Sequence, residues 1–110
     1  MKVFLIGLPG SGKSTIGKEL AAALNIPFVD LDLEIEKQEG KKITSIFKND
    51  GENFFRQVES AVLRKWCHSP SDFVMATGGG APCHLNNMEL IKISGVSFLI
   101  DVPPKEIARR

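Results

Sequence analysis

The sequence predicts an α/β fold of three layers, with a parallel β-sheet between two layers of helices. Short apolar runs typical of buried strands alternate with longer segments of helical periodicity, which is the pattern of a parallel sheet. The first apolar run passes through a glycine-rich loop straight into a helical segment. The chain has 110 residues, which is enough for one domain with one hydrophobic core.

Hydrophobic patterning justifies the elements of the first half in order. We expect a first strand at residues 2–7 and a short second strand at residues 27–30, with a helix at residues 13–24 between them. In that helix the apolar residues fall on one side at helical spacing; they are Ile16, Leu20, Ala23 and Leu24.

Residues 31–66 are expected to form consecutive helices, with breaks at Gly40 and at residues 49–51. In the last of these helices, the helical period fits either of two adjacent residues at most turns. The candidates for its buried face are Phe54 or Phe55, Val58, Ala61 or Val62, and Lys65 or Trp66.

The second half adds a third strand at residues 73–77, a short helix at residues 87–93 and a fourth strand at residues 96–101. A further helix begins at Pro103 or Pro104, since proline suits the first turn of a helix. That helix reaches only Arg110 without a capping residue, so we expect the chain to be part of a longer protein.

The loop after the first strand carries the motif G-x-x-x-x-G-K-S at residues 7–14. Its glycines let the backbone approach a ligand closely, so that loop N–H groups surround phosphate oxygens at a helix N-terminus. Lys13 is expected to reach the β- and γ-phosphates, and the Ser14 hydroxyl to bind Mg²⁺. The alternative is a glycine-rich turn with a surface lysine, but the strand–loop–helix context favours a nucleoside triphosphate site. The expected nucleotide-binding residues are Gly10, Ser11, Gly12, Lys13, Ser14 and Thr15.

Two more strands deliver unusual residues to the same edge of the sheet, because ligands gather at the carboxyl ends of parallel strands. The second strand leads into Asp30-Leu31-Asp32, and the third ends in Gly78-Gly79-Gly80. Alone, the aspartates fit a helix N-cap and the glycines fit a turn. Their position beside a phosphate loop favours function for both.

Arg56 and Glu59 lie three residues apart on one helix face, next to Phe54 and Phe55. One interpretation is an exposed ion pair of little energetic weight. The other places Arg56 at the rim of an apolar pocket, where a guanidinium is suited to bidentate capture of a carboxylate.

Composition narrows the choice of partners. The chain has 14 basic and 13 acidic residues, which gives no sign of a nucleic-acid or membrane partner, and no apolar run is long enough to span a bilayer. The N-terminus fits a first strand better than a signal peptide. Cys67 and Cys83 lack metal-type spacing, so we expect free thiols in a cytoplasmic protein. His68 and His84 are expected at the surface or in loops.

Taken together, these features resemble the shikimate kinase family. The resemblance runs in order along the whole chain, and the segments that carry it are Gly7 to Thr15, Phe28 to Asp32 with Ile35-Glu36, Ile46-Phe47, Asp50 to Glu52, Phe55-Arg56 with Glu59, and Gly78 to Gly80. It implies a P-loop kinase fold with strand order 2-3-1-4-5, of which the fifth strand is absent here. The implied reaction transfers the γ-phosphoryl of ATP to the 3-hydroxyl of shikimate, in aromatic amino acid biosynthesis, by a monomer when the protein is full length.

Carried over by position, the resemblance implies a role for each site residue. Lys13 serves the phosphates, Ser14 and Asp30 hold Mg²⁺, and Asp32 orients or deprotonates the acceptor hydroxyl. Arg56 binds the shikimate carboxylate, with Gly78, Gly79 and Gly80 contributing to the same substrate site. Phe47 and Phe55 form pocket walls, Arg110 lies near the adenine, and residues 31–62 form the helical acceptor-binding part of a single core over residues 1–110.

Family members normally continue for about another third of their length, which carries a mobile lid, a second carboxylate-binding arginine and the fifth strand. We therefore expect this 110-residue chain to be inactive by itself. Two alternatives stay open. One is another small-metabolite or nucleotide kinase of the same fold, and the other is an ATP-binding fragment without catalysis.

Overall fold

The computed structural model describes residues 1–7, 13–77 and 87–100. The described elements alternate between strand and helix until two helices follow one another after the second strand. In chain order they are β1 (Lys2–Gly7), α1 (Lys13–Leu24), β2 (Phe28–Asp30), α2 (Leu31–Glu39), α3 (Ile43–Cys67), β3 (Phe73–Ala76), α4 (Asn87–Ser94) and β4 (Val96–Ile100). The helix expected from Pro103 or Pro104 lies outside the described residues, as does His84.

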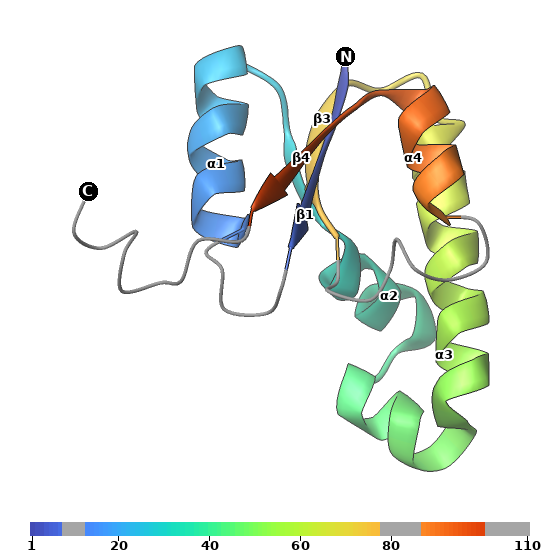
Figure 1. Cartoon of the computed structure of the whole chain (residues 1–110). Coiled ribbons are helices and arrows are strands. Elements are labelled where there is room, and N and C mark those ends of the chain that lie inside the picture. Colours follow the sequence, from blue (N-terminus) through green and yellow to red (C-terminus); the bar gives the residue numbers. More distant parts are fainter. Residues whose placement is uncertain (8–12, 78–86, 101–110) are drawn as a thin grey trace.

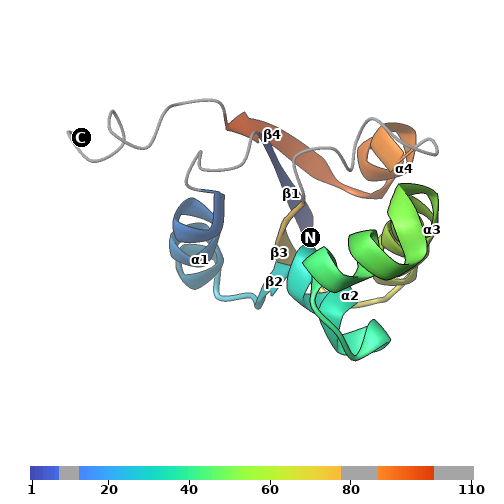
Figure 2. The ribbon, with the colours of Figure 1, turned by 90° about the horizontal axis from the view of Figure 1, so that it is seen from below.

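All described strands pair in parallel, in the order β2-β3-β1-β4. Helix α1 covers one face of the sheet, and α2, α3 and α4 lie on the other (Figures 1 and 2). This arrangement confirms the predicted three-layer α/β fold and the first four places of the expected strand order.

The larger part of the core lies between the sheet and the helices α2, α3 and α4. Phe4 and Phe73 meet edge to face there, with ring centroids 5.6 Å apart, and Trp66 meets Phe73 in the same way at 5.5 Å. On α3 the ambiguous positions resolve to Phe55, Val62 and Trp66, since Ala61 and Lys65 are exposed.

The α1 face has a smaller and wholly apolar core of Val3, Leu5, Ala21 and Val74. Ile16 and Leu20 pack against it, as expected. Ala23 and Leu24, which the sequence analysis placed on the same side, are exposed. The prediction was wrong there because the buried stripe runs through Gly17 and Ala21, from which Ala23 is offset by helical spacing, and because Leu24 is the last residue of the helix.

Two glycines with positive φ shape the helical segment that follows β2. Gly40 ends α2 with a φ of 71°, and its N–H donates to the Glu36 carbonyl. Gly51 has a φ of 87° and a ψ of 168°, which breaks α3 into two helical segments. Both breaks lie where the sequence predicted them, because glycine adopts positive φ without the steric cost of a side chain.

Strand β4 lies at the edge of the described sheet and exposes Val96, Phe98 and Leu99. In the part of the chain that the structure describes, no helix is long and apolar enough to cross a membrane.

Cys67 is a free and buried thiol, and burial raises its pKa. Cys83 lies outside the described residues.

Candidate active site

The carboxyl ends of β1, β2 and β3 point to one edge of the sheet, where α2 also begins (Figure 1). Strand β1 ends at Gly7, immediately before the phosphate-loop segment, and α1 starts at Lys13. Ser14 and Thr15 are exposed in the first turn of α1. The expected site residues Gly10, Ser11, Gly12, Gly78, Gly79, Gly80 and Arg110 lie outside the described residues.

Asp30 is the N-cap of α2. Its Oδ1 accepts hydrogen bonds from the backbone N–H groups of Asp32, at 3.0 Å, and Leu33, at 3.3 Å. The N-cap interpretation of the Asp-Leu-Asp segment is therefore correct for Asp30. Its role as a metal-site residue stays a prediction, with Oδ2 as the oxygen not used by the cap.

Asp32 lies in the first turn of α2 and is half-buried. Because Asp30 holds the Asp32 backbone N–H, the cap also fixes where the Asp32 side chain leaves the helix. Residues 1–7, 13–77 and 87–100 contain no cluster of three or more His, Cys, Asp or Glu side chains that could hold a metal ion.

Arg56 and Glu59 form a buried ion pair on α3. Arg56 Nη1 donates to Glu59 Oε1 at 2.9 Å, and the Glu59 side chain is 1% exposed. The interpretation as an exposed surface pair is wrong, because the pair forms where α3 packs against the core. A buried carboxylate is stable only with a partner of opposite charge or hydrogen-bond donors, so Glu59 fixes the guanidinium strongly.

An aromatic wall accompanies Arg56. Its Cζ lies 5.2 Å from the centroid of the Phe55 ring, and the Phe47 and Phe55 rings are 4.6 Å apart. Phe55 is buried, whereas Phe47 and Phe54 are partly open to solvent. Phe47 and Phe55 therefore form an aromatic pair beside Arg56, and the guanidinium contacts Phe55. That this pair forms the wall of a substrate pocket stays a prediction.

Three buried polar residues around the site were missed by the sequence analysis. Thr77, at the end of β3, donates from both its N–H and its Oγ1 to the Leu5 carbonyl, each at 3.0 Å. Ser60 Oγ donates to Asn87 Oδ1 at 2.8 Å, which joins α3 to the start of α4. Ser60 and Asn87 are 27 positions apart, so no local pattern could have linked them.

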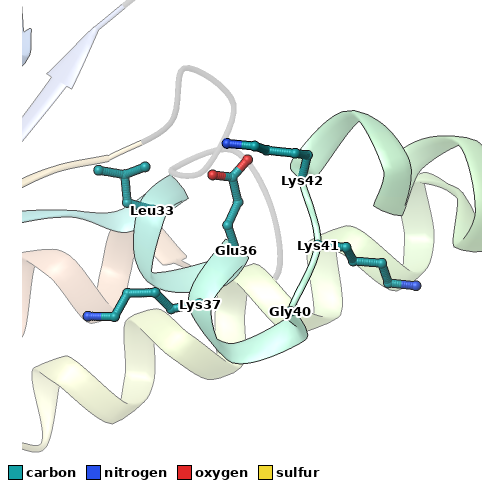
Figure 3. A pocket seen from close by; sticks show the side chains of 6 residues that line it. All are labelled: Leu33, Glu36, Lys37, Gly40, Lys41 and Lys42. Atoms are coloured by element: carbon teal, nitrogen blue, oxygen red, sulfur yellow. The ribbon is translucent and has the colours of Figure 1, made fainter.

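A hollow of about 520 Å³ lies at the turn between α2 and α3 (Figure 3). It is lined by Leu33, Glu36, Lys37, Gly40, Lys41 and Lys42. Among the described residues, none of the expected site residues lines it. Glu36 Oε2 accepts from the Ile43 N–H at 2.9 Å, and Lys41 pairs with Asp50 at 2.8 Å, so these side chains hold the start of α3 in place.

Comparisons with known proteins agree on one family. The family model described as shikimate kinase matches residues 9–110. A shikimate kinase of Persephonella marina is 43% identical over 108 residues, which cover 98% of this chain and 65% of the relative.

Solved structures give the same result. The shikimate kinase of Aquifex aeolicus superposes with a TM-score of 0.87 at 39% identity, covering 100% of this chain and 65% of that structure. The Acinetobacter baumannii enzyme in complex with shikimate has a TM-score of 0.88 at 37% identity, covering 99% and 60%. A gluconokinase of Sinorhizobium meliloti, at 19% identity and a TM-score of 0.53, shares the fold alone.

The chain thus spans about two thirds of the P. marina and A. aeolicus proteins. Within that span the phosphate-loop segment, the capped Asp30-Leu31-Asp32 segment and the Arg56–Glu59 pair occur in the order that the family resemblance implied. The chain belongs to the shikimate kinase family.

Proposed function

We propose that this chain is the core of a shikimate kinase, which transfers the γ-phosphoryl of ATP to the 3-hydroxyl of shikimate in aromatic amino acid biosynthesis. The observation that carries the proposal is the Arg56 guanidinium, which is held by buried Glu59 and lies against Phe55. Phe55 shares its hydrophobic cluster with Val29 and Leu31, next to the start of the helix that carries Asp32. Family membership and the shikimate complex of the A. baumannii relative support the same acceptor.

On the nucleotide side, Lys13 and Ser14 stand at the start of α1, directly after the phosphate-loop segment. A lysine there serves as a point charge for the β- and γ-phosphates. Hydroxyl and carboxylate oxygens are the donors that Mg²⁺ prefers, so Ser14 and Asp30 fit a metal site, with Asp30 acting through water. Mg²⁺ would neutralise charge on the phosphates.

On the acceptor side, Arg56 binds the shikimate carboxylate and Asp32 orients the attacking hydroxyl. Phosphoryl transfer passes through a loose transition state, so positioning and charge neutralisation account for most of the catalysis. Asp32 then takes the proton late in the reaction and has no need of unusual basicity. Gly78, Gly79 and Gly80 would add contacts to shikimate, and Arg110 would lie near the adenine.

The proposal includes a cytoplasmic location and a monomeric full-length enzyme. The location is supported by the free thiol of Cys67, since thiols stay reduced in the cytoplasm. The monomer rests only on the family resemblance.

An acceptor screen with the full gene product tests the proposal. Formation of ADP from ATP and Mg²⁺ is measured with shikimate, gluconate and a nucleoside monophosphate as alternative acceptors. We expect turnover with shikimate alone. Turnover with gluconate or a nucleotide but not with shikimate would assign the chain to another kinase of this fold, and nucleotide binding without any turnover would mark a non-catalytic module.

A further inference from the structure

Arg56 faces two carboxylates that differ in burial and in geometry. Glu59 is 1% exposed and accepts a hydrogen bond from Nη1 at 2.9 Å. Glu52, one turn earlier on α3, is 60% exposed, and its Oε2 lies 3.6 Å from Arg56 Nε. One guanidinium therefore balances two negative charges before any acceptor arrives.

The contact with Glu52 is ionic but falls short of a hydrogen bond, since N–H···O bonds measure about 2.7–3.2 Å. Arg56 Nε is itself buried and makes no hydrogen bond within the described part of the chain. Glu52 thus lies near the guanidinium without satisfying it, and it is open to solvent. Ion pairs of this exposed kind are weak and are screened by salt.

The geometry of the guanidinium shows why Glu52 matters. Arginine binds a carboxylate bidentately through two parallel N–H groups, and one of its two forked edges consists of Nε and Nη2. Glu59 occupies Nη1, which leaves the edge that contains Nε as the one for a second carboxylate. That is the edge at which Glu52 now lies.

We propose that Glu52 is a displaceable internal competitor, which occupies Arg56 in the free enzyme and must withdraw when the acceptor carboxylate binds. This inference rests on the proposed function and deepens it, because it makes Glu52 a determinant of affinity for anionic acceptors. Gly51 breaks the helix immediately before Glu52. A withdrawn Glu52 therefore stays at the N-terminus of a helical segment, where the helix dipole favours a carboxylate.

A structural role for Glu52 predicts the opposite sign. If Glu52 clamps Arg56 in its binding orientation, then removal of its charge weakens acceptor binding. If Glu52 competes, then removal strengthens it. Glu59 fixes Arg56 with a hydrogen bond, whereas Glu52 makes only a longer ionic contact. Removal of the two charges is therefore expected to change the acceptor affinity in opposite directions.

Calorimetric titration of the full gene product with shikimate tests the proposal on Glu52→Gln. We expect the Kd for shikimate to fall about two- to five-fold, the range of an exposed ion pair. The gain should shrink at high salt, because the lost interaction is screened. Glu19→Gln is the matched control, since it removes the same charge from an exposed position on α1, across the sheet, and should leave the Kd unchanged.

A second titration uses shikimate methyl ester, which has no carboxylate. Glu52→Gln should leave the affinity for the ester unchanged. An unchanged or weaker affinity of Glu52→Gln for shikimate, or an equal gain for the ester, would overturn the competition. If the wild-type protein binds no shikimate at all, the proposed function fails instead, and the two failures are thereby distinguished.

Discussion

The two faces of the sheet differ in what they bury. The cluster beneath α1 consists of Val3, Leu5, Ala21 and Val74, all apolar. The face covered by α2, α3 and α4 buries a charged Glu59 and the hydrogen-bonded Ser60 and Asn87 beside its larger apolar cluster. Buried polar groups cost stability unless they are paired, so this asymmetry calls for a reason.

The difference fits the way in which each proposed substrate would be held. A phosphate loop binds mainly through backbone N–H groups at a helix N-terminus, so its support can be entirely apolar. A carboxylate-binding arginine needs a fixed orientation, and Glu59 supplies it from inside the core. Among the described residues, the face of the proposed acceptor site therefore carries charge within its packing, whereas the face beneath α1 does not.

Lys13→Met is expected to have the largest effect, because it removes the side-chain charge from the phosphate site. We expect kcat of the full gene product with ATP and shikimate to fall at least about 10²-fold, the usual loss when one preorganised donor is removed. The apolar cluster beneath α1 predicts that Tm stays close to wild type. Lys18→Met, exposed on the same helix, is the control and should keep full activity.

Arg56→Ala is expected to act on the other face and on the other substrate. A hydrogen bond to a charged group contributes about 1.5–3 kcal/mol, so KM for shikimate should rise about ten- to hundred-fold while KM for ATP changes little. Equal effects on both substrates would contradict the division between the faces. Arg64→Ala, exposed on the same helix, should leave both constants unchanged.

Arg56→Ala also leaves Glu59 buried without its partner, and such losses cost up to about 3–5 kcal/mol. Arg56→Lys separates binding from folding, because lysine keeps the charge beside Glu59 but lacks the planar fork. We expect Arg56→Lys to keep a Tm near wild type and still to raise KM for shikimate. A wild-type KM in Arg56→Lys would show that bidentate binding is not required.

The sequence predicted the features that depend on local patterns, and it missed those that depend on packing between distant elements. The breaks at Gly40 and Gly51 and the start of α1 at Lys13 follow from local patterns, whereas the strand order was implied by the family resemblance; the structure confirms all of these. The burial of Glu59 and the Ser60–Asn87 bond depend on how α3 packs against the sheet and against α4. Helical periodicity also misplaced Ala23 and Leu24, because it does not show how far along a helix the buried face continues.

Gly17→Ala probes the apolar face through packing alone. A Cβ at Gly17 would lie 2.4 Å from Phe28 Cε1 and 3.2 Å from Leu5 Cδ1. Overpacking costs about 1–3 kcal/mol, and the better helix propensity of alanine offsets about 1 kcal/mol of that. We expect the free energy of unfolding to fall by up to about 2 kcal/mol in a denaturant titration. KM for shikimate should stay the same, with Lys18→Ala as the exposed control.

Ser60→Ala is expected to have the smallest effect. It measures how much an uncharged buried hydrogen bond contributes to the stability of the face covered by α2, α3 and α4. The variant removes the 2.8 Å bond to Asn87 Oδ1 between α3 and α4. A neutral hydrogen bond contributes about 1 kcal/mol, and part of that loss is offset because alanine is the better helix former. We therefore expect the free energy of unfolding to fall by about 0.5–1 kcal/mol, measured by denaturant titration against Ser45→Ala on the same helix.

If Ser60→Ala instead raises KM for shikimate as much as Arg56→Ala does, the position of Arg56 depends on α4 as well as on Glu59. The acceptor site would then extend across all the helices of that face rather than lying within α2 and α3.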